Sequence, residues 1–185
     1  MCTEYGFTEL LGWAKCFHGW SLIEQDQARD GITELTEGIA LLDSMRDEIS
    51  RTMFLGMLGE GYRKVGDSAR ASDLLAEALE RANRTGVRFY ECELHRLMGE
   101  LHLKGGDADA KRAEDCFRTA VDVAVKQNAK SWELRTTTSL ARLLASQGRR
   151  DEARSRLAEI YGWFTEGFDS PDLKDAKALL DELAT

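Results

Sequence analysis

The chain has 185 residues, 43% of them hydrophobic and 31% charged, and Pro171 is its single proline. This length is enough for one domain or a short repeat array, and so few prolines favour long helices over a β-sandwich. The net charge of −8 argues against general nucleic-acid binding, because phosphates would be repelled.

The sequence has no run of about 18 apolar residues, so no membrane span is expected. Its first residues lack the basic and apolar segments of a signal peptide, which predicts a cytoplasmic protein. Its cysteines form no CxxC pair, and in a reducing cytosol they are expected to be small buried hydrophobes. They are Cys2, Cys16, Cys92 and Cys116.

Apolar residues at helical spacing, interrupted by turn residues, predict eight helices in succession. They are expected near 7–25, 29–45, 48–65, 69–84, 87–104, 110–127, 131–146 and 150–165. A ninth helix is expected over 171–184, with Ser170 as its cap and Pro171 in its first position. Its predicted apolar stripe, which would close the array, is Leu173, Ala176, Leu180 and Leu183.

Small residues recur at a fixed period along these helices. One series is spaced 40, 40 and 42 residues apart: Gly19, Gly59, Gly99 and Ala141. A second keeps the same phase: Gly31, Ala71, Ala113 and Ala153. The two extra residues fit the turn Gly105-Gly106-Asp107, where an insertion costs little. The period predicts one domain over 1–185, made of four hairpins over about 7–46, 47–86, 87–128 and 129–168.

The second predicted hairpin carries most of a known repeat signature: Leu55, Leu58-Gly59, Tyr62, Gly66, Ala71, Leu75 and Ala78-Leu79. On these residues the chain resembles the tetratricopeptide family, although its period exceeds the usual value of about 34. The resemblance implies an all-α, right-handed superhelix of four hairpins and a capping helix. It also implies that the first helix of each hairpin lines a concave groove that binds proteins.

Three further segments narrow the resemblance: 93–101 (ELHRLMGEL), 132–135 (WELR) and 161–174 (YGWFTEGFDSPDLK). They are similar to the C-terminal repeat region of bacterial predicted ATPases that are often fused to class III adenylate or guanylate cyclase domains. This implies that the chain is a C-terminal fragment of a multidomain signalling protein. The resemblance does not imply ATPase or cyclase activity for this chain, because the chain has no GxxxxGK[ST] phosphate loop and no strand-like segment for a cyclase sheet.

Two groups of residues are candidates for a groove or interface. The first is aromatic: Trp13, Phe17 and Trp20 share one stripe of the first helix, and the tetratricopeptide resemblance turns Trp13, Cys16 and Trp20 toward the groove. The stripe would either bind a partner or pack against a preceding repeat that this chain lacks. The second group is polar and would lie along the same groove: Glu60, Arg63, Glu93, Arg96, Glu100, Arg135 and Arg142. Its arginines suit carboxylate or phosphate recognition, but the set is also typical of a solvated charged face.

No catalytic, cofactor or metal site is predicted. Cys92, His95 and His102 share a stripe, but it coincides with the packing positions of the repeat and has no HExxH or CxxC spacing. No nucleophile and base stand in a plausible array, so we do not expect an enzyme.

Charge is uneven along the chain. Residues 1–60 hold 4 basic and 11 acidic side chains, a balance of −7, and residues 111–156 hold 11 basic and 6 acidic, a balance of +5. The sequence predicts a protein-interaction and regulatory module, whose partner is another domain of its own parent chain, a separate protein, or a second copy that pairs through the N-terminal helices. The alternative is a sensor that binds a small molecule between the groove arginines and the Trp13–Trp20 face. Neither nucleic acid nor membrane is expected as a partner.

Overall fold

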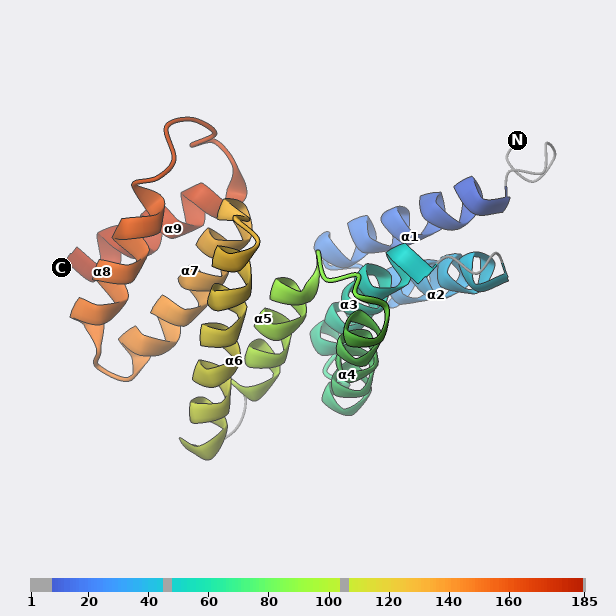
Figure 1. Ribbon diagram of the computed structural model, residues 1–185, viewed down its shortest axis with the longest axis horizontal. Coiled ribbons are helices and arrows are strands. Elements are labelled where there is room, and N and C mark those ends of the chain that lie inside the picture. The colour runs from blue at the N-terminus through green and yellow to red at the C-terminus, as the bar shows by residue number, and fades with distance from the viewer. Residues whose placement is uncertain (1–7, 45–47, 104–106, 185) are drawn as a thin grey trace. The chain divides into compact units, whose positions relative to one another are not determined.

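The computed structural model describes residues 8–44, 48–103 and 107–184. These residues form nine α-helices (Figure 1). The helices are α1 (Thr8–Glu24), α2 (Ala28–Ser44), α3 (Glu48–Lys64), α4 (Ser68–Thr85), α5 (Glu91–His102), α6 (Asp107–Lys126), α7 (Lys130–Ser146), α8 (Arg150–Tyr161) and α9 (Pro171–Ala184). None of these helices is long and apolar enough to cross a lipid bilayer. The predicted all-α class, with consecutive hairpins and a final helix, is confirmed.

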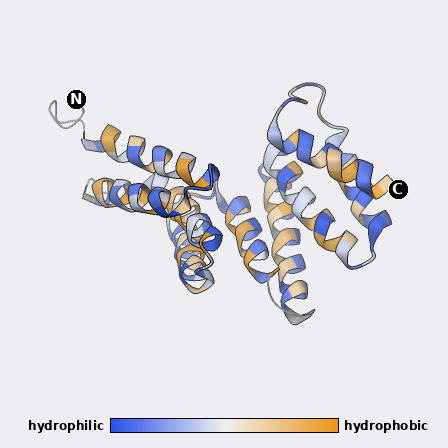
Figure 2. Ribbon diagram, turned by 180° about the vertical axis from the view of Figure 1, so that it is seen from behind, coloured by the Kyte–Doolittle hydropathy of each residue, from blue (hydrophilic) through white to orange (hydrophobic). Residues whose placement is uncertain are grey.

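The helices group into two compact units, one over Met1–Tyr90 and the other over Glu91–Thr185. In the N-terminal unit α1 packs on α2, α3 packs on α4, and α2 and α3 connect the two hairpins. In the C-terminal unit α5 pairs with α6 and α7 with α8, while α9 packs on both α7 and α8. Hydrophobic and hydrophilic residues alternate along the helices (Figure 2), as expected when one side of each helix is buried.

Small residues occupy the positions where helices cross closely. A Cβ atom added to Gly19 would lie 2.7 Å from the carbonyl oxygen of Gly31, so α1 and α2 are in contact through their backbones. In the C-terminal unit a Cβ atom on Gly99 would lie 2.5 Å from the ring of Phe117. Ala71 and Ala113, of the second small series, are fully buried. The series predicted from the 40-residue period is therefore the helix-crossing series.

The turns use the residues that the sequence indicated. Asp67 caps α4, because its Oδ1 accepts a hydrogen bond of 3.1 Å from the backbone N–H of Arg70. Gly86 ends the same helix in the left-handed region, with a φ of 74°, and its N–H donates to the carbonyl of Ala82. The predicted insertion at 105–107 lies mostly outside the described residues.

Two helix ends differ from expectation. Helix α5 begins at Glu91 rather than near 87. The segment between α4 and α5 is a turn, in which the backbone N–H of Val87 donates to the hydroxyl of Thr85 at 3.2 Å. Helix α8 ends at Tyr161 rather than near 165. Past it, the N–H of Trp163 donates to the carbonyl of Ile160, a turn bond in place of the helical one.

Helix α9 is a capping helix, as predicted. It buries Leu173, Ala176, Leu179 and Leu183 in the core of the C-terminal unit. Leu179 replaces the predicted Leu180, which is only partly buried at the edge of the same core. Both leucines lie near the boundary of the apolar stripe, and the packing of α9 on α7 and α8 covers Leu179 more fully.

Candidate functional site

The first helix of each hairpin carries the candidate residues, and the two units use these helices differently. In the N-terminal unit, α1 presents an aromatic face, which we define as Leu10, Trp13, Phe17 and Trp20 together with Phe54 of α3. In the C-terminal unit, α5, α7 and α9 share an ion-pair network, which we define as Glu93, Arg96, Glu100, Arg135, Ser139 and Asp172.

The aromatic face is organised around Phe54, a residue that the sequence reasoning missed. The Phe54 side chain is fully buried, and its ring centroid lies 5.3 Å from that of Trp13 and 5.5 Å from that of Phe17, both edge to face. Phe17 and Trp20 remain 42% and 38% exposed. The inner part of the face is thus fixed by packing on α3, while its outer part stays in contact with solvent.

The structure corrects one predicted groove residue. Cys16 is fully buried, and its Sγ lies 3.9 Å from the carbonyl oxygen of Leu35. A Cβ atom on Gly38 would collide with this sulfur, at 2.6 Å. Cys16 therefore points into the α1–α2 crossing and does not belong to the aromatic face with Trp13 and Trp20.

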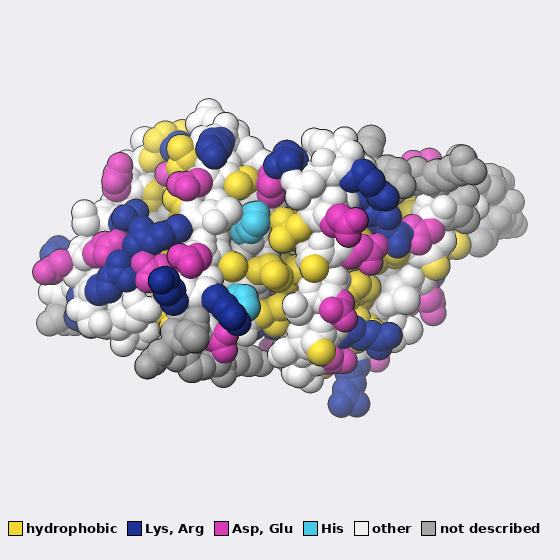
Figure 3. Space-filling view, turned by 60° about the horizontal axis from the view of Figure 1, so that its bottom comes forward, with side chains coloured by type: hydrophobic (Ala, Val, Ile, Leu, Met, Phe, Trp, Pro, Cys, Tyr) yellow, Lys and Arg dark blue, Asp and Glu magenta, His cyan; other side chains and the backbone are white. Residues whose placement is uncertain are grey.

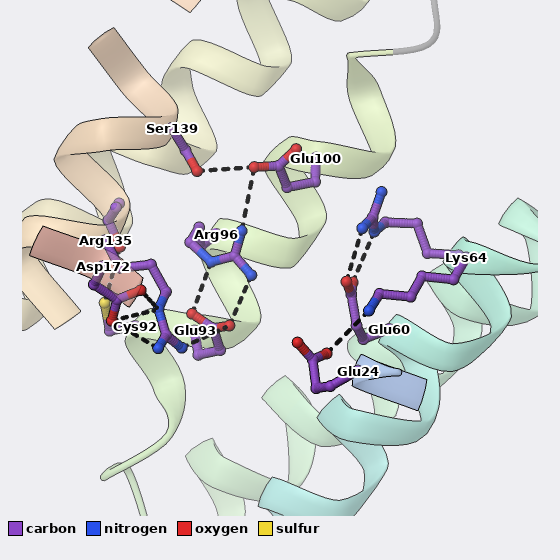
Figure 4. Close-up of polar contacts among 12 residues, drawn as sticks. Glu24, Glu60, Lys64, Cys92, Glu93, Arg96, Glu100, Arg135, Ser139 and Asp172 are labelled. Carbon is purple, nitrogen blue, oxygen red and sulfur yellow. Dashed lines mark hydrogen bonds and ion pairs between the residues drawn. The ribbon is translucent and has the colours of Figure 1, made fainter. Parts of the chain in front are cut away.

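Glu60 and Arg63 of α3 form a local ion pair. Arg63 donates from Nε and Nη2 to the two carboxylate oxygens of Glu60, each at 2.7 Å. One turn further, Lys64 Nζ donates to the carbonyl of Ile23 at 3.0 Å and to the carboxylate of Glu24 at 3.1 Å, joining α3 to the end of α1 (Figure 4). The charges beside the aromatic face are therefore held by one another.

Arg96 stands at the centre of the ion-pair network (Figure 4). It donates to both carboxylate oxygens of Glu93, at 2.8 and 2.7 Å, and its Nη1 donates to Glu100 at 3.2 Å. The hydroxyl of Ser139 on α7 donates to the same Glu100 oxygen at 2.8 Å. Glu93 is only 5% exposed, which a carboxylate tolerates here because a bidentate guanidinium compensates its charge.

The network continues from α7 to α9. Arg135 donates from Nε and Nη2 to the carboxylate of Asp172, with a shortest distance of 2.8 Å, and its Nη1 lies 3.8 Å from Glu93. Its guanidinium carbon sits 5.0 Å above the ring of Trp132. Burial has the largest influence and lowers the pKa of Arg135, but the bond to Asp172 and the negative charges of Glu93 and Asp172 together outweigh it, so the pKa is raised. One helical turn along α9, Asp175 pairs with Arg142.

The second helices of this unit carry a further cluster of charges. Arg149 and Arg118 both bind Glu114, at 2.8 and 2.7 Å, and both bind Glu152, at 2.6 and 3.0 Å. The bonds from Arg149 and Arg118 lower the pKa of Glu152 to about 2. In Figure 3, basic and acidic side chains lie beside one another over the C-terminal unit. Its positive charges are to a large extent neutralised within the chain.

The remaining candidates sit in packing positions. Cys92 is fully buried, its Sγ lies 3.4 Å from the hydroxyl of Thr136, and burial raises the pKa of its thiol to about 11. Burial also lowers the pKa of His95. His102 Nδ1 lies 3.9 Å from Asp109. No group of three potential metal ligands comes together among the residues that the structure describes.

The repeat register shows how the two faces are related. Trp20, Glu60, Glu100 and Arg142 occupy one repeat position, at spacings of 40, 40 and 42 residues. Trp13, Glu93 and Arg135 occupy another. The same positions are thus aromatic in α1, acidic in α5 and basic in α7. In the C-terminal unit these residues are held by ion pairs: Arg96 binds Glu93 and Glu100, and Arg135 and Arg142 bind carboxylates of α9. On α1, Trp20 leaves apolar surface exposed.

Comparison with known proteins agrees with this architecture. No protein-family model matches the chain. A protein of Rhizobium meliloti (strain 1021) that is itself uncharacterised is 26% identical over 134 residues, which are 72% of this chain and only 13% of that protein. Among solved structures, the nearly identical TPR-like repeats of a kinesin light chain from Podosopora anserina superpose with a TM-score of 0.67 at 16% identity, covering 95% of this chain and 86% of theirs.

The apo form of RapI superposes with a TM-score of 0.68 at 13% identity, over 94% of this chain and 48% of its own. At such identities the likeness concerns the fold. The chain has the architecture of a tetratricopeptide-like repeat module.

Proposed function

We propose that the chain is a protein-binding module that engages its partner through the aromatic face of the N-terminal unit. One observation carries the proposal. Leu10, Phe17 and Trp20 are 58%, 42% and 38% exposed along one side of α1, whereas Glu100 and Arg142, at the repeat position of Trp20, form ion pairs in the C-terminal unit. Large apolar side chains exposed together on one helix are typical of interaction surfaces.

The charges of the C-terminal unit support a structural role for its network. Arg96, Arg135 and Arg142 each bind a carboxylate of the same unit, so an anionic ligand would have to displace a bond already made. This does not favour the alternative of a small-molecule sensor that uses these arginines. It favours a module whose available recognition surface is apolar.

We further propose that the module serves within a longer bacterial signalling protein, of the cyclase and ATPase type that its sequence resembles. The alignment with a bacterial relative that is several times longer supports the longer parent chain, because the matched residues are only 13% of that protein. In such a setting the partner is another domain of the parent chain or a separate protein. The module itself contributes recognition rather than chemistry.

The test compares three immobilised forms of the chain: wild type, Phe17→Glu/Trp20→Glu, and Val125→Glu. Val125 is an exposed apolar residue of α6, 52% accessible, and supplies the matched control. Proteins of a bacterial lysate that are retained by the wild type and the control, but lost from the double variant, are the expected result. Identical retention by all three forms contradicts the proposal.

A second arm addresses the sensor alternative. Thermal shifts are recorded for the wild type and the double variant against a panel of metabolites. We expect no compound to stabilise the wild type selectively. A metabolite that raises the melting temperature of the wild type only, with no protein retained selectively in the capture experiment, would replace the proposed function with ligand sensing.

A further inference from the structure

We infer that the loop between α8 and α9 is a second docking surface, which binds a basic segment of another protein through the arginine side chains of that segment. The loop covers residues 162–170 and extends past the ends of both helices in Figure 1. We call it the aromatic–acidic loop, because its exposed side chains include Trp163, Glu166, Phe168 and Asp169. The inference concerns the C-terminal unit alone and does not depend on the aromatic face of α1.

The exposed aromatic rings of this loop are held by rings beneath them. Tyr161 and Phe164 pack against the core of the C-terminal unit. The ring centroid of Trp163 lies 5.1 Å from that of Phe164, and the centroid of Phe168 lies 5.9 Å from that of Tyr161. Trp163 and Phe168 are nevertheless 58% and 47% exposed. Each exposed ring therefore rests on a ring that the core fixes, so it can receive a partner with little further loss of side-chain freedom.

A β-turn presents two of the exposed side chains to solvent. The backbone N–H of Ser170 donates to the carbonyl of Gly167 at 2.9 Å, so Phe168 and Asp169 are the two central residues of the turn. Gly167 has a φ of 75°, in the left-handed region that glycine adopts readily. Pro171 then begins α9. An aromatic ring and a carboxylate are thus neighbours at the tip of a defined turn.

The charge of the loop selects a cationic partner. Residues 157–173 hold four acidic side chains and no basic one. Asp172 is bound by Arg135. Glu166 and Asp169 are exposed, and within the described residues neither side chain forms an ion pair or a hydrogen bond. An anionic partner would be repelled, and a purely apolar partner would have to remove two unpaired carboxylates from water. A basic segment avoids both costs.

Arginine is the side chain that matches rings and carboxylates at once. Its guanidinium stacks on aromatic faces and donates to carboxylates in a planar fork, which an ammonium group does less well. The same unit already contains this arrangement. The guanidinium carbon of Arg135 lies 5.0 Å from the centre of the Trp132 ring, while its Nη2 donates to Asp172 at 2.8 Å. Arginines of the partner are expected to repeat this arrangement on the exposed rings and carboxylates of the loop.

Fluorescence anisotropy of a labelled peptide of sequence GRGRG tests the inference on the whole chain. At about 0.05 M sodium chloride we expect a dissociation constant on the order of 100 μM, because the surface is small and open to solvent. Trp163→Ala/Phe168→Ala and Glu166→Gln/Asp169→Asn should each weaken binding at least about fivefold. Circular dichroism and thermal unfolding check that each variant is folded.

Two controls separate the loop from the overall negative charge of the chain. Asp115→Asn/Asp122→Asn removes the same charge from exposed positions of α6 and should change the dissociation constant less than about twofold. The lysine peptide GKGKG carries the same charge as GRGRG and should bind at least about threefold more weakly. An equal loss in both charge variants, or equal binding of the two peptides, would show attraction by net charge alone and overturns the inference.

Vesicles of phosphatidylcholine distinguish a lipid surface from a protein partner. Aromatic side chains also favour the interface between membrane and water, and a neutral lipid surface would not repel the acidic residues of the loop. The wild type should remain in the supernatant after sedimentation with these vesicles. Cosedimentation that is abolished by Trp163→Ala/Phe168→Ala would assign the loop to lipid and contradicts the inference.

The aromatic face of α1 is tested separately. Phe17→Glu/Trp20→Glu changes only that face and should bind GRGRG like the wild type, so the docking loop and the proposed function can fail independently. Loss of peptide binding in this variant would place the peptide on the aromatic face and overturn the inference.

Discussion

The N-terminal and C-terminal units share one scaffold and differ in the face that they build on it. Both place small residues where the helices of a hairpin cross, as at Gly31 in α2 and Ala113 in α6. On the first helices, however, Trp20 of α1 is exposed where Glu100 of α5 is ion-paired. The difference shows that the repeat period fixes the backbone arrangement and leaves the exposed positions of the first helices free to serve either stability or binding.

This comparison predicts that substitutions in the two faces differ in how much they lower the free energy of unfolding. The network of the C-terminal unit should matter for folding, because Glu93 is buried and has no solvent to replace Arg96. The aromatic face should matter less for folding, because its outer side chains are already largely in water. Four measurements can break or sharpen this distinction.

The largest expected effect is that of Glu93→Ala. Removing the carboxylate leaves the guanidinium of Arg96, whose side chain is 14% exposed, without its bidentate partner, and should cost about 3 kcal/mol. Leu10→Ala, on the aromatic face, should cost less than about 1 kcal/mol, because Leu10 is 58% exposed. Urea denaturation gives both values. Equal losses would show that the two faces do not differ in their structural role.

The next effect compares two helix crossings. A methyl group at residue 31 would meet the carbonyl oxygen of Gly19 and the backbone nitrogen of Ile23, which cannot move away, so Gly31→Ala should cost about 2–3 kcal/mol. The same change at Gly99 meets the ring of Phe117, a side chain rather than backbone, and should cost less, about 1 kcal/mol. Hydrogen exchange would locate the loss in α1 and α2 for the first variant and in α5 and α6 for the second. The reverse order of costs would mean that the α1–α2 backbones can separate.

A smaller effect concerns the attachment of α9. In a double-mutant cycle, Arg135→Ala and Asp172→Ala should show a coupling of about 1 kcal/mol, modest because both side chains are about one third exposed. Lys177 and Asp181 form a more exposed pair within α9 and serve as the control, with an expected coupling of at most about 0.5 kcal/mol. If the coupling energies of the two pairs are equal, the pair of Arg135 and Asp172 does not stabilise the packing of α9 on α7.

The smallest effect is a dependence on acid. The pKa of Glu152 is lowered to about 2 by Arg149 and Arg118, so its stabilisation is complete above its ordinary pKa of about 4.5 and is lost as the pH falls toward 2. The contribution should stay below about 1 kcal/mol, because solvent screens these exposed pairs. Glu152→Gln should lower the unfolding free energy at pH 6 and make little difference at pH 2. If the variant and the wild type differ as much in unfolding free energy at pH 2 as at pH 6, the ion pairs of Glu152 are not the cause of the difference.

Much of the fold could be predicted because backbone contact demands small residues at fixed positions. The spacing of Gly19, Gly59 and Gly99 indicates the 40-residue period. The turn residues Asp67 and Gly86 indicate where α4 begins and ends. The late start of α5 was not predictable, because residues 87–90 contain neither glycine nor proline to mark the end of the turn. Propensity alone would have continued the helix.

The candidate site was predicted less well, because pairing depends on how helices dock. Sequence places Glu93, Arg96 and Arg135 on one face, but Asp172 reaches Arg135 only because α9 lies against α7. Trp13 was expected to be uncovered, and Phe54 of the next hairpin covers it in part. Cys16 lies one residue position away from the true aromatic face, and that offset turns it into the core.

The ion-pair network has a consequence for how the protein can evolve. Because Arg96 holds Glu93 and Glu100 at once, and Ser139 holds Glu100, a change at one of these residues leaves the others unsatisfied. Substitutions there should be accepted in compensating combinations, so that this face drifts slowly among descendants. Replacing an exposed residue such as Leu10 or Trp20 leaves no charged partner unsatisfied, so these residues can be substituted one at a time. A lineage could therefore acquire a new partner through α1 while inheriting the C-terminal unit unchanged.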